Sequence, residues 1–136
     1  MTAITNEVIL AGVCPLLVTK LTTQVYPAMA ALGLPMRPLE GVRTVTEQQA
    51  RYAEGRTVPG QIVTFCDGVT TPSNHQVKPD GYGHAVDSVF VGLDPYLEHD
   101  PLSTVKWACY GAILEALGIR WGGRFRSVDL DHAEIV

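Results

Sequence analysis

Residues 84–91 (HAVDSVFV) restrict the possible folds more than any other segment, because they have the β-branched and aromatic composition of a buried strand. Side chains alternate between the two faces of a strand, so Ala85, Asp87 and Val89 share one face and His84 lies on the other. His84 and Asp87 therefore cannot easily bind the same metal ion.

The first part of the chain is predicted to be helical. Residues up to about Leu32 are apolar and helix-compatible, but Pro15 and Pro27 each remove a backbone donor, so one broken helix or two short helices would fit. This part contains the only long apolar run, residues 8–18, which we expect to be a buried helix or strand. The run is too short to span a bilayer, and it lacks the basic flank and cleavage site of a signal peptide.

A second helix is expected after Asp100 and Pro101, which are typical of the N-cap and of the first helical position. Gly118 supplies a stop signal for this helix. Apolar residues recur at helical spacing, and we expect them to face the core. The stripe consists of Leu102, Val105, Cys109, Ala112 and Ala116, and it is widened by Trp107, Ile113 and Leu117.

Between these helices the sequence predicts two short strands, residues 39–44 and residues 61–66 (QIVTFC). Thr46 is expected to begin a helix between them, in a T-x-x-Q capping box whose partner is Gln49. Gly55 is placed to end that helix in a left-handed conformation.

The tail, residues 129–136, has the pattern of a final strand. Helices packed on a small, mostly antiparallel sheet give the predicted fold class, α+β. A chain of 136 residues has the size of one domain, and no repeat, low-complexity stretch or linker divides it. We therefore expect a single domain over residues 1–136.

Composition excludes some classes of function. The net charge is −4 and no run of Lys or Arg occurs, which argues against a nucleic-acid partner and against attraction to anionic lipid. Cys14, Cys66 and Cys109 are odd in number and widely spaced, so we expect free thiols and synthesis in a reducing cytoplasm.

The four histidines are the residues most informative about chemistry, since three of them lie beside acidic residues or glycine turns. A catalytic zinc needs three protein ligands, typically His nitrogen or carboxylate oxygen, and an open fourth position. His75, Asp87 and His132 offer such a set. Spacing alone does not show that they converge, because they lie on separate segments, and a histidine in a loop is more often a solvated surface residue.

Six blocks, taken in order, resemble the phage and bacterial L-alanyl-D-glutamate endopeptidases. These enzymes are related to the D-alanyl-D-alanine dipeptidases and carboxypeptidases, and they share a metal-site architecture with lysostaphin-type enzymes and the hedgehog domain. The resemblance covers about residues 16–136. Its blocks are EGVRT (40–44), EQQARYAEGRTVPGQIVT (47–64), SNH (73–75), GHAVD (83–87), GIRWGG (118–123) and D-x-x-H-x-E (129–134).

The resemblance implies one zinc ion bound by His75, Asp87 and His132, with Asp129 as the general base. Because Asp129 and His132 are three residues apart, the chain must turn between them if both are to face the metal.

Three further polar residues match the family pattern. Arg43 is expected to bind substrate and to stabilise the oxyanion of the transition state, although a salt bridge with Glu40 or Glu47 is the alternative. Ser73 is expected to hydrogen-bond substrate, and Glu134 to orient His132.

The two remaining histidines are given no catalytic role. His84 is expected to be a packing or outer-sphere residue, and His99 a surface or helix-flanking residue. Trp121 is expected to be part of a wall or of the core.

The sequence departs from the family at two places. Family members commonly place the aspartate seven residues after the first histidine, whereas Asp87 lies twelve residues after His75, with QVKPDGYG in the intervening segment. Lengthening a turn costs closure entropy only slowly, so the longer gap is tolerable. After RWGG, Arg124 and Phe125 replace the usual acid and tryptophan, which affects the expected specificity more than the metal chemistry.

The resemblance implies a zinc peptidase that hydrolyses the L-Ala-D-Glu bond of peptidoglycan stem peptides. The expected setting is a phage endolysin without a signal peptide or a cell-wall-binding domain, held in the host cytoplasm until it reaches the periplasm and wall. We expect a monomer without membrane insertion.

Two alternatives stay open at this point. The same zinc site would serve a D-Ala-D-Ala carboxypeptidase or dipeptidase, which needs a cation for the substrate carboxylate; Arg51, Arg56, Arg124 and Arg126 are the candidates. A wall-binding module that keeps the fold but has lost turnover is the other.

Overall fold

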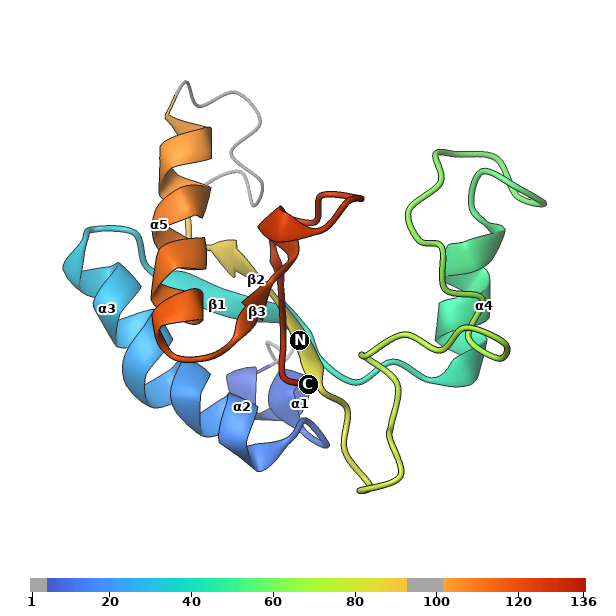
Figure 1. Cartoon of the computed structure of the whole chain (residues 1–136), viewed down its shortest axis with the longest axis horizontal. Coiled ribbons are helices and arrows are strands. Elements are labelled where there is room, and N and C mark those ends of the chain that lie inside the picture. The colour runs from blue at the N-terminus through green and yellow to red at the C-terminus, as the bar shows by residue number, and fades with distance from the viewer. Residues whose placement is uncertain (1–4, 93–101) are drawn as a thin grey trace.

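The computed structural model describes residues 5–92 and 102–136 (Figure 1). The helical segments in these ranges are α1 (Asn6–Leu10), α2 (Pro15–Lys20), η1 (Leu21–Val25), α3 (Tyr26–Ala31), α4 (Val45–Ala53), α5 (Ser103–Ala116) and η2 (Gly122–Arg124). The strands are β1 (Met36–Glu40), β2 (Ala85–Phe90), β3 (Arg120–Trp121) and β4 (His132–Glu134). Of the helices in these ranges, none combines the length and apolar character that crossing a bilayer requires.

The strands of the described ranges form one antiparallel sheet in the order β1-β2-β4-β3. The predicted fold class, α+β with a small antiparallel sheet, is therefore confirmed. The strand predicted at residues 84–91 is confirmed as β2, and every residue of β2 is buried. The tail forms the expected final strand as β4, which is shorter than residues 129–136 because a turn precedes it.

The first helical part divides into α1 and a longer segment from Pro15 to Ala31. In the longer segment a π-helical turn, η1, lies between α2 and α3, and Pro27 occupies the first turn of α3. The apolar run 8–18 is split between α1 and α2. Leu10, Val13 and Leu17 in it are buried, whereas Val8 is 64% exposed.

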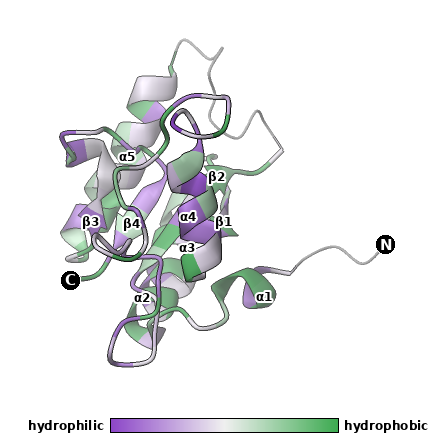
Figure 2. Cartoon of the chain, turned by 90° about the vertical axis from the view of Figure 1, so that its right-hand side faces the viewer, coloured by the Kyte–Doolittle hydropathy of each residue, from purple (hydrophilic) through white to green (hydrophobic). Residues whose placement is uncertain are grey.

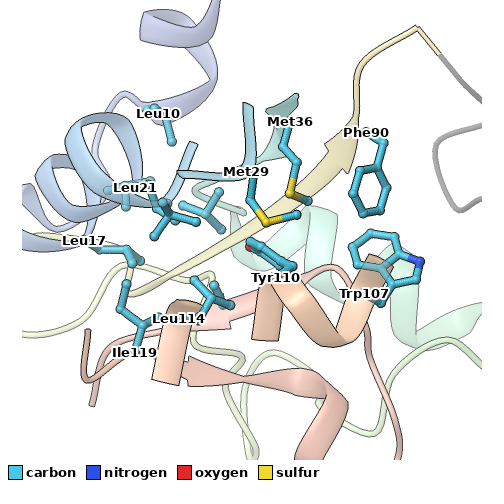
Figure 3. Packing of buried hydrophobic residues seen from close by; sticks show 14 residues of the cluster. Leu10, Leu17, Leu21, Met29, Met36, Phe90, Trp107, Tyr110, Leu114 and Ile119 are labelled. Carbon is cyan, nitrogen blue, oxygen red and sulfur yellow. The ribbon is translucent and has the colours of Figure 1, made fainter. Parts of the chain in front are cut away.

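The hydrophobic core lies between this N-terminal segment, α5 and the sheet (Figure 3). Phe90 of β2 stacks edge-on against Trp107 of α5 with ring centroids 4.6 Å apart. Figure 1 shows α4 standing apart from the other helices, on the other side of the strands. Large core residues labelled in Figure 3 are Leu17, Leu21, Met29, Met36, Tyr110, Leu114 and Ile119.

The predicted apolar face of α5 is correct only in part. Trp107 is buried, and Cys109, Ile113 and Leu117 pack against the core as expected, but the remaining residues of the predicted stripe are exposed. Leu102 and Val105 are each 59% exposed, and the buried residues are Trp107, Tyr110, Gly111 and Leu114. Apolar residues occur on all sides of this helix, so the sequence pattern does not indicate which side packs against the core. Gly111 decides it, because a side chain there would collide with the ring of Trp121, which lies against the helix backbone. The predicted N-cap, Asp100 with Pro101, lies outside the described residues.

The helix and strand boundaries around residue 40 also differ from the prediction. The strand is Met36–Glu40 rather than residues 39–44, and the capping box pairs Thr44 with Glu47 rather than Thr46 with Gln49. The helix α4 therefore starts earlier than expected. Its predicted end is confirmed, since Gly55 has a φ of +78° just after the C-cap.

The strand predicted at residues 61–66 is absent from the structure. This segment pairs with no strand of the described ranges, and side chains of α4 and its C-terminal turn bond to two of its carbonyls instead. Arg56 donates to the carbonyl of Thr64 at 3.0 Å, and Gln48 donates to the carbonyl of Cys66 at 2.8 Å. Phe65 is 67% exposed. The apolar composition that predicted a buried strand belongs to an exposed segment at the edge of a cleft.

Candidate active site

An open cleft of about 830 Å³ separates the sheet from α4 and the segment that follows α4. Its lining comes from the end of β1, from Arg43, from α4, from Asp87 on β2, and from residues 63–66, 72–75, 125, 127–129, 131, 132 and 134. Figure 2, which views the molecule from the α4 side, shows α4 in front of the strands. The candidate residues His75, Asp87, His132 and Asp129 all line this cleft.

His75, Asp87 and His132 converge in the structure. Asp87 on β2 and His132 on β4 are direct register partners across the sheet, so their side chains meet on one face. His75 reaches them from the loop before β2. Its Nε2 lies 3.2 Å from Asp87 Oδ1, and Nδ1 of His132 lies 3.3 Å from the same oxygen. One donor atom from each residue falls within 4.8 Å of the other two.

The ring of His75 is fixed by its surroundings. Its Nδ1 lies 2.8 Å from the carbonyl oxygen of Gly41, an acceptor that requires the proton on Nδ1. The backbone N–H of His75 donates to Ser73 Oγ at 3.2 Å, and its carbonyl accepts from the N–H of Arg43 at 2.9 Å. The Nε2 lone pair of His75 is therefore directed toward Asp87 and His132.

His132 is held in the same manner through its other nitrogen. Its Nε2 lies 2.7 Å from Glu134 Oε1, and Asn74 donates to the second oxygen of Glu134 at 2.7 Å. The contact between Glu134 and His132 is the one expected from the sequence. Burial raises the pKa of Glu134, whereas the hydrogen bonds from His132 and Asn74 lower it. The hydrogen bonds prevail, so the pKa is lower than usual. Glu134 is thus a carboxylate that orients the imidazole.

Asp87 carries an oxygen without a satisfactory partner among the described residues. Its Oδ1 is buried and accepts no hydrogen bond of good geometry, although two ring nitrogens lie nearby. Burial raises the pKa of Asp87, but the close polar contacts with His132 and His75 outweigh it and hold the pKa well below its usual range. Burial lowers the pKa of His132, but Asp87 and Glu134 outweigh it and raise that pKa to about 10.

These observations show that the three side chains fit a divalent metal. Two imidazole nitrogens and one ionised carboxylate oxygen face a common point, and both rings are tied to acceptors on their far side, as metal-binding histidines usually are. A bound cation would satisfy the orphaned oxygen of Asp87 and would replace the proton that His132 otherwise carries.

Asp129 stands beside this group. Its Oδ2 lies 3.8 Å from His132 Nδ1, and its side chain is 52% exposed. The turn that the sequence requires between Asp129 and His132 is present, and the N–H of His132 donates to the carbonyl of Asp129 at 3.2 Å. Carboxylate oxygens of Asp87, Asp129 and Asp131 also lie within 4.8 Å of one another.

Arg43 forms the salt bridge that was considered as the alternative to a substrate-binding role, and it also lines the cleft. Its Nε donates to Glu40 at 2.8 Å, so the alternative salt bridge is present, and its Nη1 donates to Gln48 at 2.6 Å. Its Nη2 lies 3.8 Å from Asp87 Oδ2. The guanidinium is thus fixed by two partners while it lines the cleft next to Asp87. Ser73 is buried and lines the same cleft.

The longer gap between His75 and Asp87 does not displace either residue. The N–H of His84 donates to the carbonyl of Asn74 at 2.8 Å, which closes the intervening loop at its base. The extra residues project from this base as a turn in which Gly81 has a φ of +91°. His84 itself contacts Asp80 at 2.7 Å and lies outside the metal-binding group, while His99 lies outside the described residues.

Several polar residues of the site were not predicted from the sequence. Gln48 is fully buried and binds Arg43, Gln76 ties Ser73 to Gly68, and Asn74 supports Glu134. Asp131 is also buried. Gln48, Asn74 and Asp131 lie within the family-like blocks and Gln76 directly follows one, but nothing in their spacing indicated burial.

An antiparallel sheet brings two histidines and an aspartate together beside another carboxylate in an open cleft, which is an arrangement suited to a metal-dependent hydrolase. The profile of the family described as D-alanyl-D-alanine carboxypeptidase matches residues 67–135, and the chain belongs to this M15 peptidase family.

The chain is also similar to one curated protein and to one solved structure. It is 32% identical over 116 residues to the peptidoglycan L-alanyl-D-glutamate endopeptidase CwlK of Bacillus subtilis (strain 168), covering 80% of this chain and 65% of CwlK. The chain thus spans about two-thirds of the length of that relative. The crystal structure of the Serratia marcescens L-Ala D-Glu endopeptidase ChiX matches with a TM-score of 0.59 and 20% identity, over 96% of this chain and 86% of ChiX. This likeness supports the fold.

Proposed function

We propose that this protein is a zinc-dependent endopeptidase that hydrolyses the L-Ala-D-Glu amide bond of peptidoglycan stem peptides. The observation that carries the proposal is the convergence of His75, Asp87 and His132 beside the half-exposed Asp129. CwlK and ChiX, which carry this activity in their names, supply the bond that is cut.

His75, Asp87 and His132 would hold the metal, and their donor set is one that zinc commonly takes in hydrolases. Zinc supplies a Lewis acid that polarises a carbonyl and acidifies a water molecule. Asp129 accepts the proton of the attacking water and then delivers it to the departing amine of D-Glu. Arg43, held by Glu40 and Gln48, places a permanent positive charge beside the oxygen that becomes anionic. Ser73 is available as a hydrogen-bonding group for the substrate.

A digestion experiment tests both the bond and the metal. Purified protein is incubated with soluble murein fragments, and mass spectrometry identifies the new termini before and after treatment with a chelator. We expect new D-Glu amino termini, loss of cleavage after chelation, and recovery when zinc is added back. Cleavage that persists without metal would reject the metallopeptidase mechanism.

A D-Ala-D-Ala carboxypeptidase is the second candidate, because the matching family profile has that description. The same digest distinguishes the two activities, since a carboxypeptidase releases free D-alanine and leaves the L-Ala-D-Glu bond intact. A protein that binds one zinc ion and murein but releases neither product would be a non-catalytic wall-binding module.

We further propose that the protein acts as a monomeric phage endolysin, because its motifs resemble those of phage and bacterial L-alanyl-D-glutamate endopeptidases. Expression in the cytoplasm of a Gram-negative host should cause lysis only when a membrane-permeabilising protein is also produced. Lysis without that protein, or elution as an oligomer in size-exclusion chromatography, would contradict this setting.

A further inference from the structure

Arg51 occupies a distinct position on the α4 side of the cleft. It lines the cleft, and its side chain is 47% exposed. Its Nη2 donates to Glu40 Oε2 at 3.1 Å, which is the ion pair it makes within the described residues. Nε and Nη1 of Arg51 therefore have no protein acceptor in those ranges and face a solvated cleft.

The other arginines considered for a substrate carboxylate lie away from the cleft lining. Arg56 donates to the carbonyls of Tyr52 and Thr64 and lies 3.8 Å from the centroid of the Tyr52 ring. Arg124 pairs with Glu115 at 2.9 Å. Arg56, Arg124 and Arg126 do not line this cleft. Arg51 is the candidate that the fold brings to the site.

The charge of the cleft gives this position its importance. Six carboxylates line it, from Glu40, Glu47, Asp87, Asp129, Asp131 and Glu134, whereas the lining arginines of the described residues are Arg43 and Arg51. The Nε and Nη1 of Arg43 are occupied by Glu40 and Gln48. An anionic peptide entering this cleft therefore meets repulsion except near Arg51 and the bound metal.

A chain of contacts connects Arg51 to the metal-binding group. Glu40 accepts from Arg51 through one oxygen and from Arg43 through the other, and Arg43 Nη2 in turn lies 3.8 Å from Asp87. Arg51 is thus held on the same side of the cleft as the fixed guanidinium of Arg43, with its free edge available to a ligand.

We propose that Arg51 binds a free carboxylate of the murein peptide and makes the enzyme selective for substrates that carry it. This inference rests on the proposed endopeptidase activity. D-Glu in a stem peptide is linked through its side-chain carboxyl, so its α-carboxylate remains free next to the scissile bond. The terminal carboxylate of the stem is a second source of the same chemistry. A guanidinium binds either one with two parallel hydrogen bonds.

Three synthetic stem tripeptides that begin with L-Ala-γ-D-Glu distinguish these sources. One has both carboxylates free, one has the α-carboxylate of D-Glu converted to a carboxamide, and one has its C-terminal carboxylate amidated. The zinc-loaded full chain is compared with Arg51→Gln and Arg51→Lys. Arg124→Gln is the matched control, because it removes an exposed arginine that also pairs with a glutamate but lies off the cleft.

We expect the wild-type protein to prefer the fully charged peptide over one of the two amides by about tenfold in kcat/KM, mainly through KM. Arg51→Gln should lower kcat/KM for the charged peptide by about tenfold. For the amide that the wild type cuts less well, kcat/KM of Arg51→Gln should stay within about twofold of the wild-type value, and Arg51→Lys should retain part of the preference for the charged peptide. Arg124→Gln should behave like the wild type. The carboxylate whose amidation lowers kcat/KM of the wild-type protein is the one that Arg51 binds.

Equal loss on all three peptides in Arg51→Gln, or unchanged selectivity, would overturn the role of Arg51 while leaving the endopeptidase activity intact. Failure of the wild type to cut any of the peptides at the L-Ala-D-Glu bond would instead reject the proposed function. Circular dichroism and thermal unfolding of each variant separate a local effect from a folding defect.

Discussion

The cleft lies between a wall formed by the sheet and a wall formed by α4 with residues 61–76, and the interiors behind these walls differ in chemical character. Behind the sheet, the fully buried side chains are mostly apolar and come from the N-terminal helices, β2 and α5. Such packing is non-directional and involves many contacts. It holds β2 and β4, and with them Asp87 and His132, at a fixed separation.

Behind the α4 wall, the fully buried side chain is a glutamine. Gln48 accepts from Arg43 at 2.6 Å and donates to the side chain of Thr64 and the carbonyl of Cys66. Gln76 adds a bond to the carbonyl of Gly68. This wall depends on a few directional bonds, each of which fails completely when a partner is lost. Asp87 and His132 on the sheet are thus positioned by packing, whereas Arg43 is positioned by a polar network.

The largest expected effect concerns chemistry on the sheet wall. Asp129→Ala should lower kcat by roughly two to four powers of ten, because it removes the general base, while zinc content stays near one ion per chain. Steady-state kinetics and metal analysis measure the two quantities separately. Asp80→Ala, which removes an acid from the loop before β2, is the control and should retain nearly full activity. Full activity in Asp129→Ala would remove Asp129 from its role.

The apolar interior behind the sheet should show the largest effect on stability. Leu114→Ala removes a fully buried side chain, and we expect it to lower the free energy of unfolding by about 2–5 kcal/mol. Leu102→Ala, on the exposed face of the same helical segment, should change it by less than about 0.5 kcal/mol. Urea unfolding measures both. Equal costs would mean that the face of α5 is misassigned.

A smaller and more local effect is expected in the α4 wall. Gln48→Ala removes the partner of Arg43 Nη1 and of the Cys66 carbonyl, which should cost about 2 kcal/mol. Hydrogen exchange should accelerate at the amides of Cys66 and Gly68, while the amides of β2 keep their protection.

The exposed neighbour Gln49 provides the matched control for that experiment, and Gln49→Ala should have little effect on stability or exchange. If hydrogen exchange in Gln48→Ala accelerates equally at the amides of β2, the two walls unfold as one unit and do not differ in local stability.

The smallest expected effect lies at the start of α4. The backbone and side chain of Thr44 bond to Glu47 and lower the pKa of this exposed carboxyl. Glu47→Ala should therefore cost about 0.5 kcal/mol at neutral pH. Since the folded pKa is depressed, this contribution is present above pH of about 4.3 and is lost as pH falls through the folded value. Thermal unfolding of both proteins from pH 7 to pH 3 checks whether the difference disappears.

The sequence predicted the sheet side of the molecule better than the α4 side. Alternation in residues 84–91 gave the strand and the face of Asp87, because a strand in a core has a strict period of two. Residues 61–66 have similar composition, yet they lie exposed beside the cleft, since their backbone is bonded by side chains of α4 and its C-terminal turn. Gln48 carries no pattern that distinguishes it from Gln49, because its burial depends on partners distant in the chain.

The hydrogen bond between His84 and Asn74 holds the two ends of the intervening loop together. The position of His75 is therefore independent of the number of residues in the loop. In such proteins the number of residues between two motif positions is therefore a poor guide to whether the two side chains meet. The same anchoring makes the tip of this loop, around Gly81, a practical place to graft a reporter peptide or an affinity handle without disturbing the chemistry below it.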